Sequence, residues 1–326
     1  MTAETTSPNP PVERRHASPN SPVERSHASP NARVERRHAS PNARVERSHA
    51  GPNAPVERSH AGPKPLVERS HAAPRPAHPR DEPHATAPLQ WSIVIPAFNE
   101  ARRLPPYLDE VVGFFEGRGE PWECVVVDDG STDGTADAVR AVTARCPAVR
   151  ALVLGPRNHG KGGAVRAGML SAVGRFRLFT DADGATPIAE LKRLEPALTA
   201  GADVVIGSRA LPDPSVSVRS LPHRRRAGRV FNRLVTGVGL GGIEDSQCGF
   251  KAFTARAALS LFGALRTEGF GFDVEVLLRA RAAGYRVVEV AVNWADQSGS
   301  KVGVFKNGPG MVAQVLVAAL RVRIGR

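Results

Sequence analysis

Residues 123–135 read ECVVVDDGSTDGT, a β-branched apolar run that ends in two carboxylates, Asp128 and Asp129. Valine-rich runs of this length, followed by glycine and polar residues, are typical of strands that are buried on both faces of a parallel sheet. Acidic side chains at the end of such a strand cost free energy unless a ligand, a cation or hydrogen-bond donors compensate them. The segment therefore predicts a buried strand that brings polar groups to one edge of a sheet.

Similar segments on both sides of this strand predict an α/β fold. Further strands are expected at 91–95, 150–154, 177–180 and 204–206. Helical patterns separate them at about 103–117, 133–145, 162–173 and 187–200. This alternation predicts a mainly parallel sheet with helices on both faces. Later elements are expected as helices at 255–262 and 272–283, a strand near 287–290 and a final amphipathic helix from about Pro309.

The N-terminal quarter of the chain has a different composition. Six eleven-residue units, roughly VERxHAxPNxx, begin at Val12, Val23, Val34, Val45, Val56 and Val67. An eleven-residue period can mark a helical supercoil. Here every unit contains proline and few apolar residues, so neither a long helix nor a core is expected. We predict a disordered Pro/His/Arg-rich tail over 1–89, a folded domain over 90–304 and a C-terminal amphipathic helix over 305–326.

Charge and cysteine content narrow the partners and the compartment. The formal net charge is +12, and residues 1–90 contain 13 Lys and Arg against 9 Asp and Glu, so the rest of the chain is basic too. A basic surface suits nucleic acid, anionic lipid or a diphosphate ligand, and charge alone does not distinguish them. The three cysteines lack the spacing of zinc sites or disulfide frameworks, which favours a reducing cytoplasm. Without an apolar run of about 18 residues, any membrane contact is expected to be peripheral or through a partner.

The segments after the predicted strands contain the candidate chemistry, because ligands of parallel sheets bind beyond the carboxyl ends of the strands. PAFNE (96–100) follows the first strand, and DADG (181–184) follows the fourth. Asp181 and Asp183 alternate along an extended segment, so both can face one Mg²⁺ or Mn²⁺ ion. Such an ion would neutralise a departing diphosphate. A lone D-x-D is also compatible with a solvated turn, and the position opposite Asp128 and Asp129 favours the metal site.

A competing nucleotide-binding motif lies at residues 155–161, GPRNHGK, which match GxxxxGK between a predicted strand and a helix. The strand that ends in Asp181 imitates the acidic Walker B partner, so a P-loop NTPase is an alternative. However, Gly162 occupies the position of the Ser or Thr that binds Mg²⁺ in P-loops. The missing hydroxyl makes this alternative the weaker one.

Taken together, six motifs in chain order resemble the family 2 glycosyltransferases. They are PAFNE (96–100), VVDDGSTDGT (126–135), HGKGGAVRAG (159–168), DADGAT (181–186), GSR (207–209) and DSQCGFKAF (245–253). With FDVEVL (272–277) and VNWADQSGSK (292–301), the pattern is most similar to dolichyl-phosphate β-glucosyltransferases. The resemblance covers about residues 91–304. It implies a GT-A fold and an inverting transfer of glucose from UDP-glucose to a polyprenyl phosphate, with Mg²⁺ or Mn²⁺ as cofactor.

The resemblance also implies a role for each matched residue. The donor-binding set is Pro96, Ala97, Glu100, Asp128, Asp129, Lys161, Asp181, Arg209 and Ser300. Asp181 and Asp183 are the expected metal ligands, and the catalytic set is Asp245, Asp183 and Lys301. Asp245 would lie nearest the acceptor, and Ser300 with Lys301 would close over the diphosphate. The sequence departs from the family pattern at two places. Ala185 stands where mannosyl-transferring relatives have a glutamine that binds the metal. A proline-rich repeat stands where the lipid glucosyltransferases usually have an N-terminal membrane helix.

A basic amphipathic segment predicts how a lipid substrate is reached. Arginines 219, 224, 225, 226, 229 and 233 accompany Leu221, Val230, Phe231, Leu234 and Val235, as in an interfacial helix on anionic lipid. A solvated basic face is the alternative. The expected partners are a UDP-sugar, a polyprenyl phosphate and an anionic membrane surface, with no nucleic acid, and the expected location is the cytoplasmic face of the membrane. Remaining alternatives are another donor such as GDP-mannose, a non-lipid acceptor, or a non-catalytic sugar-nucleotide-binding protein.

Overall fold

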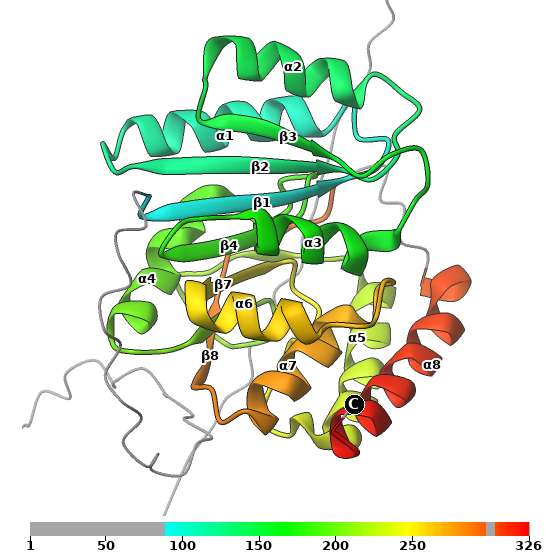
Figure 1. Ribbon diagram of the computed structural model, residues 1–326. Coiled ribbons are helices and arrows are strands. Elements are labelled where there is room, and N and C mark those ends of the chain that lie inside the picture. Colours follow the sequence, from blue (N-terminus) through cyan, green and yellow to red (C-terminus); the bar gives the residue numbers. More distant parts are fainter. Residues whose placement is uncertain (1–88, 298–303, 326) are drawn as a thin grey trace, which may run out of the picture. The chain divides into compact units, whose positions relative to one another are not determined.

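The computed structural model describes residues 89–297 and 304–325, except for the side chains of 222–227 and 304–307. Its centre is a seven-stranded sheet of order β3-β2-β1-β4-β7-β5-β8 (Figure 1). The strands are β1 (Trp91–Ala97), β2 (Trp122–Asp128), β3 (Val149–Val153), β4 (Phe176–Thr180), β5 (Val204–Ser208), β7 (Phe250–Thr254) and β8 (Val287–Ala291). Only β7 runs antiparallel to its neighbours, β4 and β5. The short strands β6 (Val218–Arg219) and β9 (Trp294–Ala295) form a separate parallel pair.

Helices cover both faces of the sheet. They are α1 (Leu104–Glu116), α2 (Thr135–Arg145), α3 (Gly160–Ser171), α4 (Leu191–Thr199), α5 (Pro222–Val235), α6 (Ala255–Ala264), α7 (Phe272–Ala282) and α8 (Val304–Arg323). One core cluster joins α1, α2 and α4 to one face, and a second joins α3, α6, α7 and α8 to the other. In the part of the chain that the structure describes, none of these helices combines the length and the apolarity needed to cross a bilayer.

The valine run of β2 is uninterrupted because the sheet is buried on both sides. Val126 belongs to the first core cluster, whereas Val125 and Val127 belong to the second. Asp128 ends the strand, where it pairs with Ala97 of β1 and Val153 of β3. Because β1, β2 and β3 are parallel and in register, the polar residues that follow them lie at the carboxyl edge of the sheet.

The early strands and helices agree with the sequence prediction, and the main difference is β7. Its sequence, FKAFT, places Phe250 and Ala252 in one core cluster and Phe253 in the other. Lys251 interrupts the apolar run, and its burial, at 1% exposure, has no local signal in the sequence. The final helix also begins earlier than expected, at Val304, and includes Pro309.

Close packing of α3 on the sheet depends on the absence of a side chain at Gly168. A Cβ there would collide with Val94 of β1 and lie 2.7 Å from Cγ2 of Val127 in β2. We predict that Gly168→Ala lowers the free energy of unfolding by about 2 kcal/mol through overpacking. Gly113→Ala is the matched control, because a Cβ added at that exposed position of α1 would have no neighbouring atom within 4 Å. The control should gain up to about 1 kcal/mol of stability from helix propensity.

Urea denaturation of the full chain measures both changes. A Gly168→Ala variant as stable as the Gly113→Ala variant would contradict this account of the packing between α3 and the sheet.

Candidate functional site

Asp128 and Asp129 form the first part of the site, at the carboxyl end of β2. Asp128 accepts a hydrogen bond from the backbone N–H of Ser131 at 2.9 Å. Oδ1 of Asp129 accepts from the backbone N–H of His159 at 2.8 Å and lies 3.0 Å from its Nδ1. Among the described residues no donor reaches Oδ2 of Asp129, although that atom is buried. A buried acceptor of this kind is suited to a donor group of a bound ligand.

The loop after β1 lies beside this pair, because Asp129 N–H donates to the carbonyl of Ala97 at 2.9 Å. Ala97 is buried and Pro96 is half-buried. Glu100 is also buried, and its carboxylate binds Arg103 at 2.7 and 2.5 Å. The residues predicted to bind the nucleoside are therefore neighbours at one edge of the sheet. Glu100 holds Arg103 at this edge, a role that the PAFNE motif alone does not indicate.

Asp181 and Asp183 follow β4 and face the same region. Nζ of Lys161 lies 2.7 Å from Oδ1 of Asp181, and Nη1 of Arg103 lies 3.7 Å from Oδ2 of Asp183. Asp183 also accepts from the backbone N–H of Ala185 at 3.1 Å. Burial, reinforced by the negative charge of Asp181, raises the pKa of Asp183. Added positive charge would offset that repulsion between the two carboxylates.

Gly249 allows Asp181 to take this position. The backbone N–H of Asp181 donates to the Gly249 carbonyl at 3.1 Å, because Thr180 and Phe250 are register partners of β4 and β7. A Cβ at residue 249 would collide with the carboxylate of Asp181. The motifs DADGAT and DSQCGFKAF are therefore in direct contact.

Acidic and basic side chains alternate along a path that leads from Asp181 into the core. Lys161 lies 5.3 Å from the ring centroid of Phe179, and behind it Lys251 binds Asp273 at 2.6 Å with both side chains buried. Burial by itself lowers the pKa of Lys161, but the charges of Asp181 and Asp273 outweigh it, so the net shift is upward. Lys161 therefore stays protonated beside the carboxylates. Asp273 is a buried residue of α7 and not a surface residue.

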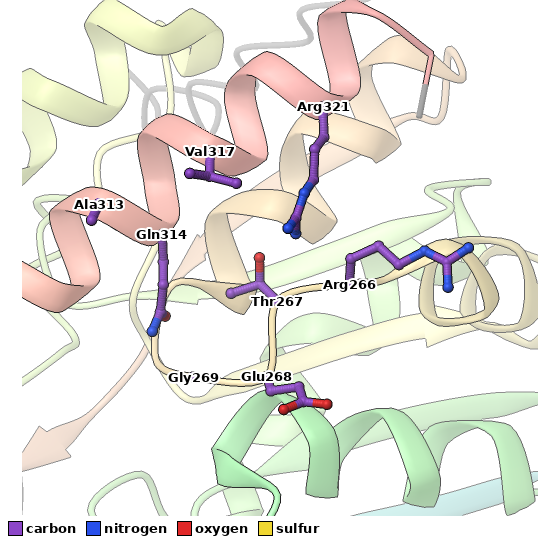
Figure 2. Close-up of a pocket in the computed structure, with 8 residues that line it drawn as sticks. All are labelled: Arg266, Thr267, Glu268, Gly269, Ala313, Gln314, Val317 and Arg321. Carbon is purple, nitrogen blue, oxygen red and sulfur yellow. The ribbon is translucent and has the colours of Figure 1, made fainter.

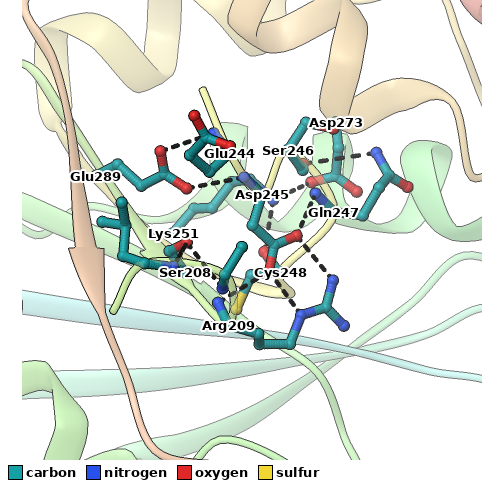
Figure 3. Close-up of polar contacts among 12 residues, drawn as sticks. Ser208, Arg209, Glu244, Asp245, Ser246, Gln247, Cys248, Lys251, Asp273 and Glu289 are labelled. Atoms are coloured by element: carbon teal, nitrogen blue, oxygen red, sulfur yellow. Dashed lines mark hydrogen bonds and ion pairs between the residues drawn. The ribbon is translucent and has the colours of Figure 1, made fainter. Parts of the chain in front are cut away.

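Asp245 and Arg209 form a separate ion pair beside these residues (Figure 3). Nε and Nη2 of Arg209 donate to the two carboxylate oxygens of Asp245 at 2.6 and 2.8 Å, and its backbone N–H donates at 3.0 Å. Burial alone raises the pKa of Asp245, but Arg209 outweighs it and holds that pKa below its ordinary value. The guanidinium also lies 5.4 Å from the ring centroid of Trp294. Asp245 is thus ionised and oriented by an arginine.

Glu289 of β8 supports this pair from behind, a role that the sequence did not indicate. Its carboxylate accepts from the backbone N–H groups of Asp245 and Glu244 at 2.8 and 2.9 Å (Figure 3). The loop that contains Asp245 is therefore attached to the edge strand of the sheet by two hydrogen bonds to one side chain.

The amino end of α3 does not have the arrangement of a phosphate-binding loop. The N–H groups of Gly162 and Gly163 both donate to the carbonyl of Glu268, at 2.6 and 3.2 Å. A Cβ at Gly160 would lie 2.6 Å from the same oxygen, so these glycines allow two backbones to approach. Because the amides are already bonded and Lys161 binds Asp181, the P-loop alternative is rejected.

Some predicted residues lie outside the described part of the chain or have another environment. Ser300 and Lys301 are outside the described residues. In α5, Val235 is buried, and Phe231 and Leu234 pack against the second core cluster. These three residues stabilise the core instead of facing a membrane, which corrects part of the predicted interfacial set.

The residues present fit a divalent cation that shares its coordination with a ligand. Among residues 89–297 and 304–325, no group of three or more His, Cys, Asp and Glu side chains is arranged to hold a metal ion. Asp181 and Asp183 supply carboxylate oxygens, which Mg²⁺ and Mn²⁺ prefer. Mg²⁺ in such sites is commonly held by one or two carboxylates and by substrate phosphates. The donor set thus matches a cation that arrives with a diphosphate.

Comparison with known proteins agrees with this geometry. The Glycosyl transferase family 2 model matches residues 92–262. The dolichyl-phosphate beta-glucosyltransferase of Drosophila melanogaster is 42% identical over 230 residues, which cover 67% of this chain and 70% of that protein. The Homo sapiens protein of the same name is 37% identical over 250 residues, with 72% and 76% covered.

Solved structures extend the comparison to the fold. Glucosyl-3-phosphoglycerate synthase from Mycobacterium tuberculosis, in complex with Mn²⁺ and UDP-glucose, superposes with a TM-score of 0.56. The match has 20% sequence identity and covers 72% of this chain and 79% of that one. The superposition identifies the mainly parallel sheet flanked by helices as a GT-A glycosyltransferase fold. The chain belongs to glycosyl transferase family 2 and is a glycosyltransferase.

The buried ion pair between Lys251 and Asp273 gives a stability prediction. Asp273→Asn leaves an uncompensated ammonium in the core and should lower the free energy of unfolding by about 3 kcal/mol or more. The double variant Lys251→Met with Asp273→Leu removes both charges and should recover most of that loss. Chemical denaturation tests both, and a single variant within about 0.5 kcal/mol of wild type would contradict the pair's burial.

Gly249 provides a prediction about metal binding that differs from a stability effect. Gly249→Ala should displace the carboxylate of Asp181 and weaken Mn²⁺ binding in the presence of UDP-glucose by on the order of tenfold or more, as expected for a lost supporting contact. Gly263→Ala, at an exposed position of α6 with no neighbour within 4 Å of an added Cβ, is the matched control. Titration calorimetry measures both affinities. Unchanged Mn²⁺ affinity in folded Gly249→Ala would refute the assignment of Asp181 as a metal ligand that Gly249 positions.

Proposed function

We propose that this protein transfers glucose, with inversion, from UDP-glucose to a polyprenyl phosphate of the dolichyl type. The proposal includes a divalent cation, Mg²⁺ or Mn²⁺, held by Asp181 and Asp183. Relatives at 33–42% identity are named dolichyl-phosphate beta-glucosyltransferases, which supports the sugar and the lipid acceptor. Structures of the glucosyl-3-phosphoglycerate synthase with Mn²⁺ and UDP-glucose support the cation and the donor.

One observation supports the proposal most strongly: polar groups from four separate segments meet at one sheet edge. Asp129 offers a buried acceptor, and Asp181 and Asp183 offer two carboxylates. Lys161 and Arg103 place positive charge beside those carboxylates. A nucleoside diphosphate has hydrogen-bond donors at one end and an anionic diphosphate at the other, so its chemistry matches this arrangement.

The donor side of the reaction requires electrostatic stabilisation. A divalent cation held by Asp181 and Asp183 would supply Lewis-acid stabilisation of the departing diphosphate. Lys161 stays protonated, because Asp181 and Asp273 raise its pKa, and it contributes a fixed positive charge close to the same groups. Such preorganised charges are most effective where negative charge develops in the transition state. The aromatic rings of Phe179 and Phe272, 5.3 and 5.9 Å from Nζ, limit the freedom of that ammonium.

On the acceptor side, Asp245 orients an arginine. A phosphate monoester has a second pKa near 6 and is largely dianionic at neutral pH, so its oxygen attacks without a strong base. Asp245 has a lowered pKa and three hydrogen bonds from Arg209, which makes it a poor proton acceptor. We assign it the role of holding the guanidinium where it can neutralise the incoming acceptor. Two anions must approach each other in this reaction, and such a cation reduces their repulsion.

The place of action follows from the acceptor. A polyprenyl phosphate is confined to a bilayer, so the enzyme would work at a membrane surface. We propose peripheral association with the cytoplasmic face, with an anionic membrane surface as partner and no nucleic acid. The basic side chains of Arg229 and Arg233, exposed on α5, are compatible with such a surface.

The direct test uses the purified full chain, Mn²⁺ or Mg²⁺, a panel of labelled sugar nucleotides and a detergent-dispersed polyprenyl phosphate. We expect label from UDP-glucose, more than from GDP-mannose, to enter the lipid extract. Asp183→Ala should reduce turnover on the order of 10²-fold or more, in line with other lost electrostatic groups. Exclusive use of GDP-mannose, transfer only to water-soluble acceptors, or full turnover by folded Asp183→Ala would each reject the proposal.

A further inference from the structure

The helix α8 has two apolar faces, and only one of them is used by the core. Val315, Ala318 and Ala319 are buried, and α8 packs against α7 and α5. The outer face of α8 consists of Leu316, Val317 and Leu320, together with Ile324 in the turn that follows the helix, and these side chains are 50, 45, 60 and 55% exposed. This spacing forms one continuous stripe along a helix. Four large apolar side chains on one exposed stripe are more than isolated surface residues and indicate an interaction surface.

Positive charge surrounds the outer face of α8. Arg321 and Arg323 lie in its last turn, and the sequence of α8 contains neither Asp nor Glu. Arg266, from the loop that precedes α7, lies across a cavity of about 340 Å³ from α8 (Figure 2). In the part of the chain that the structure describes, no ion pair joins Arg266 or Arg321 to a carboxylate. The surface therefore combines apolar side chains with unneutralised arginines.

The cavity between these arginines is polar on one side and apolar on the other. Thr267 and Gln314 line it together with Val317, a residue of the outer face (Figure 2). Glu268 also borders the cavity, but its side chain points toward α3 and away from α8 (Figure 2). The volume falls within the range of roughly 300–1,000 Å³ that small-molecule sites occupy. Arg321 of α8 and Arg266 of the facing loop line this one cavity, although the side chain of Arg266 extends away from α8 in Figure 2. Arginines beside apolar side chains are suited to a phosphate ester with an acyl chain.

Charge decides among the occupants that would cover the outer face. The chain's own N-terminal 90 residues have an excess of Lys and Arg, and a second copy that paired through the same face would present the same arginines. Both would place positive charge against positive charge. An anionic bilayer is complementary instead, since arginines bind its phosphates while apolar side chains enter the interfacial region.

We propose that α8 is a membrane-docking helix whose outer face enters an anionic phospholipid bilayer, with a phospholipid headgroup bound at the cavity that Arg266 and Arg321 line. The proposal rests on the proposed function for its purpose, which is to bring the active site to a lipid acceptor. α8 lies on the side of the sheet toward which β1 and β2 point (Figure 1). The carboxyl edge of the sheet, with Asp128 and Asp181, is therefore on the side that would face the bilayer.

The test is sedimentation of the full chain with vesicles in the absence of donor and acceptor. One set is pure phosphatidylcholine, and the other contains roughly one-third phosphatidylglycerol, an anionic fraction sufficient to attract basic segments. We expect binding to the anionic vesicles only. The double variant Leu316→Gln with Leu320→Gln should weaken it on the order of tenfold or more, because two apolar side chains no longer enter the interface.

A second variant tests the headgroup site separately. Arg266→Gln with Arg321→Gln should reduce affinity for anionic vesicles roughly fivefold for each arginine removed.

Leu259→Gln is the matched control for the leucine double variant. Leu259 of α6 is 49% exposed, close to the 50% of Leu316, but it lies outside the outer face. The control should bind as wild type does, and thermal unfolding verifies that all variants are folded.

Three results would overturn the docking proposal. The first is wild-type binding by both double variants, and the second is an equal loss in the Leu259→Gln control. The third is a concentration-dependent dimer that Leu316→Gln with Leu320→Gln dissociates, which would make a second copy the occupant. Transferase activity toward detergent-dispersed acceptor should stay unchanged in these variants. If the wild type lacks that activity but still binds vesicles as expected, the proposed function fails and the docking proposal stands.

Discussion

The contact between the Asp181 carboxylate and Gly249 is the constraint on which the rest of the site depends. It exists because β7 runs antiparallel beside β4 and places residue 249 opposite residue 181. Only a residue without a side chain leaves room for the carboxylate there. The one antiparallel strand in an otherwise parallel sheet thus joins the segment proposed to bind the metal to the loop that contains Asp245. Asp181 and Gly249 are 68 residues apart in the sequence, and the motifs that contain them act as one structural unit.

The charges around this contact alternate in sign, which makes a dense group of carboxylates compatible with folding. Lys161 offsets Asp181, and Lys251 offsets Asp273 deeper in the core. Buried ion pairs contribute little net stability compared with apolar residues, but removing one partner is strongly destabilising. The main effect of these ion pairs is therefore to hold the charged side chains in fixed positions. A transferase that must stabilise a departing diphosphate benefits from charges that do not need to reorganise.

Sequence patterns predicted the early strands and helices well, because valine-rich runs and amphipathic periods reflect burial directly. They did not predict β7, since Lys251 interrupts its apolar run and finds its partner, Asp273, 22 residues later. Arg103 and Glu289 were missed for the same reason, because their roles depend on contacts with other segments. The apolar spacing of α8 was visible in the sequence, but only the structure separates the buried Val315 from the exposed Leu316 and Leu320. The sequence singled out most of the residues that we propose to contact the ligand because they directly follow strands, and their ligand contacts stay a prediction.

We propose that Asp181 and Asp183 meet the diphosphate of an activated sugar through a shared cation, with Asp129 beside the nucleoside. Anomalous diffraction from crystals grown with Mn²⁺ and UDP-glucose tests this arrangement. We expect one manganese peak within coordination distance of Asp181 or Asp183 and of the diphosphate, with the uracil ring beside Asp129. A manganese ion bound elsewhere, or UDP-glucose bound at the sheet edge without any metal contact to these carboxylates, would contradict it.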